Sequence, residues 1–228
     1  MSAFFYSAAY CCRQIYLIFS ERFRVLIRLI NESGSSFRKG ALMDKDKGEL
    51  YYRRYLEGDD TALVDMICDY KDGVILYLCG ITGSFSLAEE YMEDTFFRIA
   101  AKKPRFSGRS SFKTWLFTIA RNTAIDGMRK MSRISDKPIE EYGDISDERS
   151  IEKEYLREEQ KISLHRAMES LNSDYRQVLY LIFFEDLSNS EAARVMKKNC
   201  RQIENLLYRA KQALRSKLEK EGFEYERL

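Results

Sequence analysis

Residues 188–215 have the sequence SNSEAARVMKKNCRQIENLLYRAKQALR, which carries the signals of two short helices joined by a tight turn. Ser188 precedes Glu191 by three residues, the spacing of a capping box that satisfies free amide groups at a helix start. Asn199 and Gln202 repeat this spacing, and apolar residues then recur at helical intervals. The stretch therefore predicts a helix-turn-helix whose second, longer helix begins at Asn199.

Basic residues dominate the polar side of this helix pair. From Arg194 to Lys217 there are eight of them, against the single acid Glu204. The phosphate backbone of DNA is a natural counterpart, because neutralising phosphates releases condensed counterions. A solvated basic face on a purely structural helix pair is the other interpretation, since charged faces are common on helices.

The composition favours a helical protein that is not an enzyme. Only two prolines and eleven glycines occur in 228 residues, and 45% of the residues are hydrophobic, enough for one or two modest cores. The five cysteines lack C-x-x-C spacing and His165 is the single histidine, so we expect no metal, no cofactor and reduced cytoplasmic thiols. No nucleophile with a neighbouring base and no glycine-rich phosphate loop suggests catalysis.

The fold class is expected to be all-α, with two small helical domains. The first should span residues 44–131 and the second residues 161–220, joined by a flexible acidic linker at 132–160 and followed by a tail at 221–228. Turn and capping residues predict five helices in the first domain, at about 49–57, 60–70, 72–80, 86–103 and 110–130. The core of the second domain is expected to contain Ile162, Leu164, Met168, Leu171, Val178, Leu179, Leu181, Ile182 and Leu187.

Residues 1–43 differ from the rest of the chain. Their uncharged apolar run at 1–12 is too short to span a membrane, which takes about 20 apolar residues. We expect either a disordered extension or a start codon placed too early, with Met43 as the working start. An amphipathic helix at residues 1–30, lying on a membrane surface, is the alternative.

Charge is divided along the first domain. Residues 44–94 contain thirteen acids and five basic residues, whereas residues 98–130 contain nine basic residues and the single acid Asp126. The acidic part repels nucleic acid and the basic part attracts it. One face of this domain is therefore expected to meet a protein and the other DNA.

Two runs resemble conserved regions of the extracytoplasmic-function (ECF) sigma factors, the short bacterial subunits that bring RNA polymerase to promoters. Residues 106–126 read FSGRSSFKTWLFTIARNTAID, within a segment at 88–130 that looks like the second region of the family. Residues 164–215, including LLYRAKQAL, look like its fourth region. The order and spacing of the regions also match, and together they cover about residues 48–218.

The resemblance implies a function in transcription initiation, with core RNA polymerase and promoter DNA as partners and an anti-sigma factor as a further candidate. The alternative is a polymerase-independent helix-turn-helix regulator, associated with a membrane through residues 1–30. The run at 106–130 argues against this alternative, because binding of duplex DNA alone gives no reason for a second basic, aromatic-bearing surface.

The resemblance also assigns residues to three surfaces. Capture of unpaired bases at the minus-ten element needs a basic groove with stacking or pocket residues, and the matching positions are Phe106, Arg109, Lys113, Arg121, Asn122, Asp126, Arg129 and Lys130. Recognition of the minus-thirty-five duplex falls to Lys198, Arg201, Gln202, Asn205, Tyr208 and Arg209. The face that docks onto core polymerase carries Glu89, Glu90, Glu93, Asp94 and Phe97.

Within the first surface, Asn122 corresponds to the base-reading position of the family, since an amide can both donate to and accept from a base edge. Structural alternatives remain for single residues. Trp115 is expected in the core, Phe106 could anchor its loop by packing, and Asn122 could simply be solvated. The sequence departs from the family at Lys197, where the turn usually has glycine, and at Glu204 and Leu206, where a basic residue is common.

Overall fold

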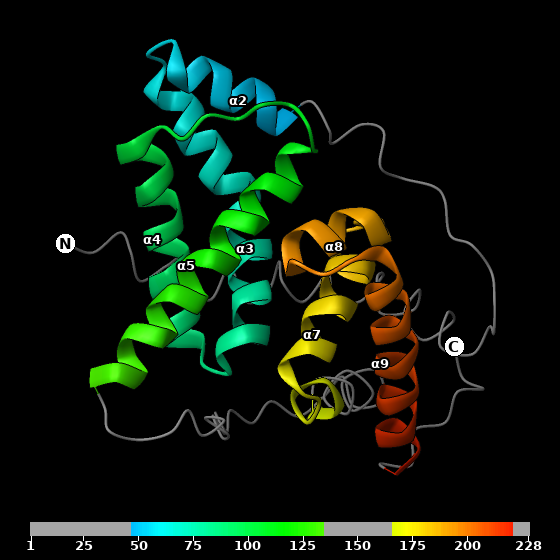
Figure 1. Ribbon diagram of the computed structural model, residues 1–228. Helices are drawn as coiled ribbons and strands as arrows, with labels where there is room; N and C mark the ends of the chain where they lie inside the picture. The colour runs from blue at the N-terminus through cyan, green and yellow to red at the C-terminus, as the bar shows by residue number, and fades with distance from the viewer. Residues whose placement is uncertain (1–46, 135–165, 221–228) are drawn as a thin grey trace, which may run out of the picture.

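The computed structural model describes residues 47–134 and 166–220, and it is helical in both ranges with no strand in either, which confirms the all-α prediction (Figure 1). The helices of the first range form the first lobe: α2 (Lys47–Leu56), α3 (Asp60–Thr82), α4 (Phe85–Lys102) and α5 (Phe112–Ile134). Those of the second range form the second lobe: α7 (Ser173–Leu179), the π-helix η1 (Tyr180–Phe184), α8 (Asn189–Met196) and α9 (Cys200–Lys220). The predicted extension at 1–43 and tail at 221–228 lie outside the described residues, as does the predicted linker beyond the end of α5.

The prediction of two separate helices between residues 60 and 80 is wrong, because α3 is continuous. Asp72 resembles a helix start in the sequence, yet it lies in the middle of this helix. Tyr70 and Val74 on either side of it are buried in the core, and their burial outweighs the weak local preference of one aspartate. At the true start, the carboxylate of Asp59 caps the helix by accepting from the amide of Thr61.

The turn between α3 and α4 depends on Gly83, which has a left-handed backbone conformation with φ 67°. Glycine adopts this conformation without steric cost. The next residue, Ser84, accepts a hydrogen bond from the amide of Leu87 and caps α4. The cap therefore lies two residues before Ser86, the residue that the sequence pattern favours.

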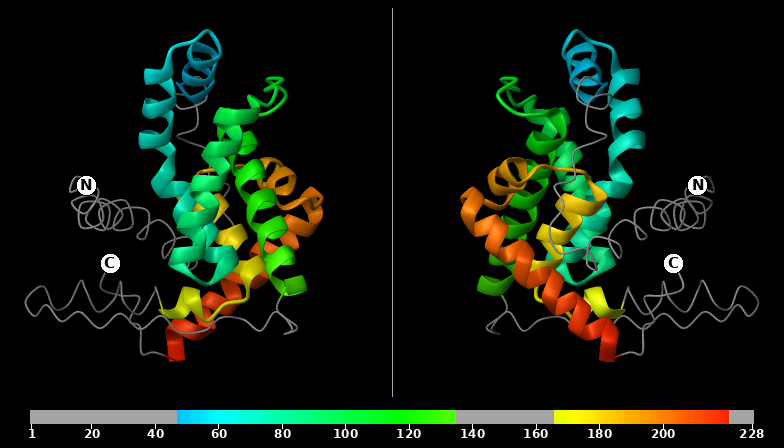
Figure 2. Two further views of the ribbon diagram at one scale, coloured as in Figure 1. Left: turned by 90° about the vertical axis from the view of Figure 1, so that its left-hand side faces the viewer. Right: turned by 90° about the vertical axis from the view of Figure 1, so that its right-hand side faces the viewer.

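Helix α5 packs against α3 and α4 of the first lobe and against α8 of the second lobe, while α3 contacts α7 and η1 (Figures 1 and 2). Its inward side carries the buried residues Phe112, Leu116, Phe117, Ala120, Thr123 and Ala124. Helix α4 approaches it closely at Gly127, where a Cβ atom would stand 2.4 Å from Cε1 of Tyr91. Only glycine fits this contact without displacing the tyrosine ring.

Both predicted capping motifs of the helix-turn-helix are present. The Ser188 hydroxyl accepts from the amide of Glu191, and the Glu191 carboxylate accepts from the amide of Ser188, which forms a complete capping box at α8. At α9 the side-chain oxygens of Asn199 and Gln202 each accept a hydrogen bond from the backbone N–H of the other residue, both at 2.8 Å. These local signals fix the start of both helices.

The core of the second lobe agrees with the expected set where it is described. Leu171, Val178, Leu179, Leu181 and Leu187 are buried, whereas Met168 and Ile182 are partly buried. Ile162 and Leu164 lie outside the described residues. Helix α9 contributes Ile203, Ala210, Leu214 and Leu218 to the same core.

We expect Lys197→Gly to raise the free energy of unfolding of the second lobe. Lys197 ends α8 in a left-handed conformation with φ 54°, which costs a residue with a Cβ atom about 1–2 kcal/mol. Glycine removes this strain but loses more backbone entropy on folding. The free energy of unfolding, measured by urea denaturation, should therefore rise by about 1 kcal/mol. Lys197→Ala is the matched control, because it removes the side chain and keeps Cβ. Equal stability of the two variants would contradict the prediction.

Candidate nucleic-acid interface

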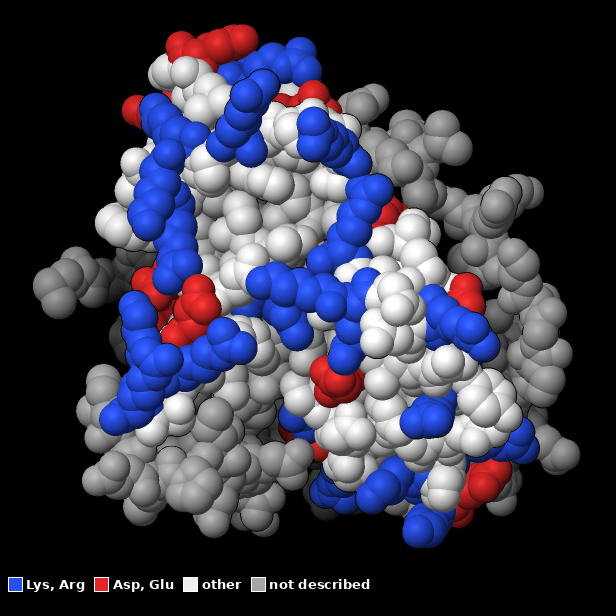
Figure 3. Space-filling model, viewed as in Figure 1, with Lys and Arg blue, Asp and Glu red and all other residues white. Residues whose placement is uncertain are grey.

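The predicted minus-ten residues lie on α5 and on the connection that precedes it. Arg109, Asp126, Arg129 and Lys130 are exposed, and Asn122 is half-buried on the same helix. Figure 3 shows an uncharged surface over α4 and α5 that Lys and Arg side chains border on several sides. A surface of this kind suits a single strand, because basic side chains can hold its phosphates while bases lie against the uncharged centre.

Two of the predicted phosphate-binding residues instead face the second lobe. The Lys113 Nζ atom lies 3.1 Å from the Glu185 carboxylate, and the two side chains are only 19% and 10% exposed. The Arg121 Nε atom donates to the side-chain oxygen of Gln177 at 3.2 Å. In this structure both basic groups are therefore occupied by partners within the protein.

The contact with Gln177 belongs to a larger polar network between the lobes. Tyr77 of α3, which is fully buried, donates its hydroxyl proton to the same oxygen at 3.3 Å. Burial raises the pKa of Tyr77 far above its usual value, so the hydroxyl stays protonated and remains a donor. The amide nitrogen of Gln177 in turn donates to Ser173. No sequence signal marks this network, because its members are distant along the chain.

Helix α8 also contacts the start of α5. The Glu191 carboxylate accepts from the hydroxyls of Ser111 at 2.7 Å and Thr114 at 3.3 Å. The guanidinium of Arg194 donates to the backbone oxygen of Arg109 at 2.7 Å. Glu191 thus has two roles, capping its own helix and binding the first turn of the predicted minus-ten helix.

The two predicted DNA surfaces are nevertheless not pressed against each other. The contact between the lobes runs through α3 and α5 on one side and α7, η1 and α8 on the other. Helix α9 keeps its polar face exposed, and Figure 1 shows it to the right of α7 and α8, with α5 to their left. The basic face of α9 is therefore available to duplex DNA while the lobes are in contact.

The connection between α4 and α5 is anchored by aromatic rings. Phe106 lies with its ring centroid 5.8 Å from that of Phe112 and 5.4 Å from that of Trp115, both in edge-on arrangements. Tyr52 of α2 packs on Trp115 at 5.1 Å. Phe106 thus packs, as the structural alternative proposes, while it remains partly exposed. The contribution of Tyr52 could not be predicted from the sequence, because Tyr52 belongs to no motif.

The predicted minus-thirty-five face of α9 is mostly free of contacts with the core. Arg201, Gln202, Asn205, Tyr208 and Arg209 are all exposed, Tyr208 to 64%. Three predicted residues have side-chain partners in the protein. The Gln202 amide oxygen is part of the helix cap, Lys198 pairs with Asp174 at 3.1 Å, and the Tyr208 hydroxyl accepts from the Gln212 side chain at 2.6 Å. While the cap is formed, Gln202 can still contact a base through its amide nitrogen or through the second lone pair of its oxygen.

The predicted polymerase-docking residues form one exposed stripe on α4. Glu89, Glu90, Glu93, Asp94 and Phe97 are all exposed, and Phe97 is 70% exposed. The opposite side of the helix carries Ala88, Tyr91, Thr95, Phe96 and Ile99, which are buried. A large apolar side chain held in solvent among carboxylates suits a protein partner better than DNA.

Other kinds of site find little support in the described part of the chain. No group of three His, Cys, Asp or Glu side chains there is placed to hold a metal ion. No helix in the described ranges has the length and apolar character needed to cross a membrane. Burial raises the pKa of the Cys79 thiol to about 12, which disfavours the reactive thiolate.

Family profiles match both lobes. The family described as Sigma-70 region 2 matches residues 66–134, and the family described as Sigma-70, region 4 matches residues 161–214. Helix α2 lies before the first matched residue.

Individual proteins that are similar to this chain are also sigma factors. The chain is 30% identical over 150 residues to the ECF RNA polymerase sigma factor SigM of Bacillus subtilis, covering 64% of this chain and 89% of SigM. It is 26% identical over 182 residues to the RNA polymerase sigma-H factor of Pseudomonas aeruginosa, covering 76% of this chain and 94% of that factor. Among solved structures, the sigma factor RpoE in complex with the anti-sigma factor NepR from Bartonella quintana is similar, with a TM-score of 0.55 and 25% identity over 68% of this chain and 95% of RpoE.

Proposed function

We propose that this chain, which belongs to the extracytoplasmic-function family of RNA polymerase sigma factors, divides promoter recognition between its two lobes. It is a transcription initiation factor, and the matched segments include both the region 2 and the region 4 families. A polymerase-independent regulator is therefore not favoured. The observation that supports the division is the presence of two separate exposed polar surfaces, one on α5 and one on α9.

In this proposal the first lobe captures the unpaired minus-ten strand. Asn122 reads a base, while Arg109, Arg129 and Lys130 hold phosphates from exposed positions on α5 and its preceding connection. Lys113 and Arg121 join them only after they leave Glu185 and Gln177. DNA phosphate has to displace these internal partners, so strand capture and lobe separation are coupled.

The second lobe recognises the minus-thirty-five duplex through the exposed face of α9. Asn205 and Arg209 lie on the outer side of the helix, where a major groove can receive them. Glu204 is exposed on the same helix and can accept from the amino group of a cytosine. This acid gives the chain a preference that differs from that of relatives with a basic residue at the position.

Two protein partners follow from the same surfaces. The exposed stripe of α4, with Phe97 at its C-terminal end, docks onto core RNA polymerase. The solved relative RpoE is bound to the anti-sigma factor NepR, and we propose an anti-sigma partner for this chain as well. The protein acts in the cytoplasm, where polymerase and promoter are found, and needs neither a cofactor nor a metal.

In vitro transcription with core RNA polymerase tests the function directly. The purified full-length protein should produce a transcript with one defined start on DNA from upstream of its own gene, and core enzyme alone should not. A protein that leaves core polymerase without any promoter-specific product on genomic promoter DNA would not be acting as a sigma factor.

Asn122→Ala should reduce promoter opening by about ten-fold, since one base-reading contact is worth about 1–3 kcal/mol. Binding of the closed duplex should change little, because α9 makes that contact. Permanganate reactivity of unpaired thymines measures opening, and filter binding measures the closed complex. Asn205→Ala is the matched control and should show the reverse pattern. An unchanged permanganate footprint in Asn122→Ala would remove the assigned role.

Arg209→Ala should weaken duplex binding and reduce the slope of log affinity against log salt by about one unit, the effect of losing one phosphate contact. Arg215→Ala removes the same charge from the same helix, but its guanidinium pairs with Glu219 at 2.9 Å. The slope of this control should change by less than half as much. Equal slopes for both variants would mean that Arg209 acts only through net charge.

A further inference from the structure

The connection between α4 and α5, residues 103–111, contains the predicted strand-reading residues that precede α5 but has no helix of its own to hold it in place. Its backbone takes left-handed conformations at Lys103, with φ 41°, and at Gly108, with φ 69°. A captured base must offset a few kcal/mol of lost stacking and pairing. A connection that is already ordered loses less entropy on binding and leaves more of the contact energy for this purpose.

Tyr52 of α2 holds the beginning of this connection through a hydrogen bond. Its hydroxyl donates to the backbone oxygen of Pro104 at 2.6 Å, and the residue is only 2% exposed. Burial raises the pKa of Tyr52 to about 12, so the hydroxyl remains a donor at any physiological pH.

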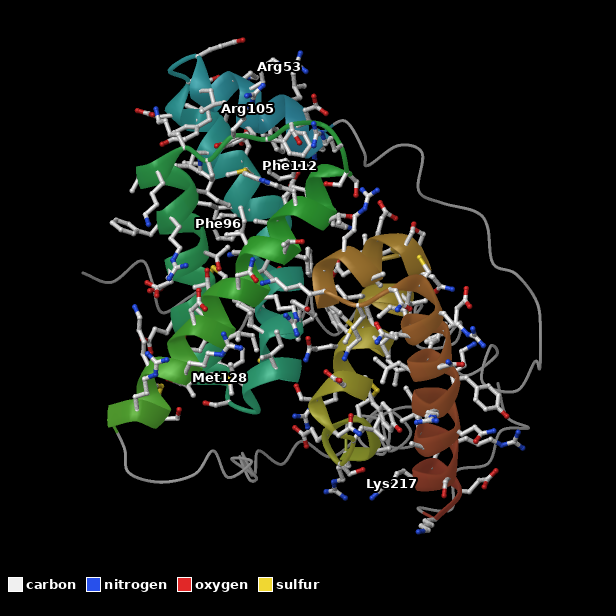
Figure 4. All side chains as sticks on the ribbon, in the orientation of Figure 1. Arg53, Phe96, Arg105, Phe112, Met128 and Lys217 are labelled. Carbon is white, nitrogen blue, oxygen red and sulfur yellow. The ribbon has the colours of Figure 1, made fainter. Side chains whose placement is uncertain are left out.

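The ring of Tyr52 also contacts the connection indirectly, through two aromatic rings of α5. It lies 5.1 Å from the ring of Trp115 and 6.1 Å from that of Phe112. These two rings are the ones against which Phe106 packs. Figure 4 shows Phe112 at the start of α5, beneath α2 and the connection. Contacts of this kind contribute about 0.5–1.5 kcal/mol each beyond the area that they bury.

Tyr55, one turn further along α2, fixes the end of α4. Its hydroxyl donates to the backbone oxygen of Ala100 at 3.0 Å, and the Lys103 ammonium lies 4.7 Å above its ring. At the other end of α2, Gly48 permits a close approach to the start of α5, because a Cβ atom there would overlap Cδ1 of Phe112. Helix α2 is therefore fitted against the connection and the start of α5 along one face.

We propose that Tyr52 and Tyr55 of α2, which precede the residues matched by the region 2 family, are positioning residues that hold the connection at residues 103–111 ready for capture of the minus-ten strand. This inference rests on the proposed function, because it assumes that the connection contacts unpaired DNA. Neither tyrosine touches DNA itself. Tyr52 acts through Pro104 and Phe106, and Tyr55 acts through the last turn of α4.

Tyr52→Phe in the full-length protein tests the proposal, since it removes the hydroxyl and keeps the ring. The amides of Lys103 and Trp115 flank the connection and are hydrogen-bonded, to Ile99 and Ser111 at 3.1 Å each. Losing the Tyr52 hydrogen bond should make these two amides exchange with solvent about three- to ten-fold faster. Promoter opening by the holoenzyme, followed with permanganate, should fall by a similar factor, and duplex binding by α9 should stay the same. Trp115 is the single tryptophan, and its quenching by acrylamide gives a second measure of the packing beside Tyr52.

Tyr51→Phe is the matched control, because the Tyr51 hydroxyl donates to Asp69 at 3.1 Å and does not reach the connection. It should leave both exchange and opening as in the parent protein. Tyr55→Phe provides an independent second variant with the same expected direction as Tyr52→Phe.

The possible results separate this inference from the proposed function. Unchanged exchange at the amides of Lys103 and Trp115 in both Tyr52→Phe and Tyr55→Phe would overturn positioning, whatever the transcription result. Faster exchange with unchanged opening would overturn a role in strand capture. A parent protein that yields no promoter-specific transcript would instead reject the proposed function, and the exchange measurement would still decide whether α2 orders the connection.

Discussion

Phe112→Ala is expected to lower the free energy of unfolding of the first lobe by about 3–5 kcal/mol. Phe112 is 1% exposed, and its ring lies between those of Tyr70 and Trp115, at 5.6 and 5.3 Å. Its loss leaves a cavity where α2, α3 and α5 meet, and it removes one of the two rings that hold Phe106. Unfolding in urea, followed through the fluorescence of Trp115, reports on this lobe directly.

Phe97→Ala is the control for this variant because it makes the same chemical change at a side chain that is 70% exposed. Its effect on unfolding should stay within about 0.5 kcal/mol. A loss of less than about 1 kcal/mol for Phe112→Ala would mean that the aromatic cluster is not the centre of the lobe.

Glu185→Lys is expected to separate the two lobes. The change replaces a nearly buried ion pair with two ammonium groups at the position of Lys113 and Glu185, and loss of one partner from a buried pair costs about 3–5 kcal/mol. The equilibrium between contacting and separated lobes should therefore shift by about a hundred-fold or more. Small-angle scattering of the full-length protein should show a larger radius of gyration.

The double variant Lys113→Glu with Glu185→Lys restores opposite charges at the same place and should recover much of the compact form. Tyr180 also donates to Glu185, at 3.0 Å, so the double variant separates loss of the ion pair from disturbance within the second lobe. An unchanged radius of gyration in Glu185→Lys would show that the pair does not hold the lobes together.

What could be predicted from the sequence was local in origin. The capping pairs at Ser188 and Asn199 need only neighbouring residues, and both form as expected. The all-α class follows from helical periodicity and capping signals in the same way, whereas the docking stripe of α4 is assigned by resemblance to the family. The break expected near Asp72 failed because burial of Tyr70 and Val74 depends on residues far along the chain, which a local pattern does not contain.

The contact between the lobes could not be predicted for the same reason. Lys113 and Glu185 are 72 residues apart, and in the sequence each resembles an ordinary charged surface residue. Gly73 shows how specific the fit is, because a Cβ atom there would stand 2.7 Å from the carboxylate of Glu185. Basic residues assigned to DNA by resemblance thus have internal partners that only the folded chain reveals.

The engagement of Lys113 and Arg121 inside the protein bears on how tightly promoter DNA is held. If both residues bind phosphate as proposed, the measured dissociation constant for DNA includes the free energy of breaking these internal contacts. The measured constant then equals the intrinsic constant divided by the fraction of molecules whose lobes are already separated. Any ligand that favours the open form, including the polymerase itself, would then tighten DNA binding without touching the DNA. The strength of the ion pair between Lys113 and Glu185 would then help to set the concentration of this factor at which its promoter is half occupied.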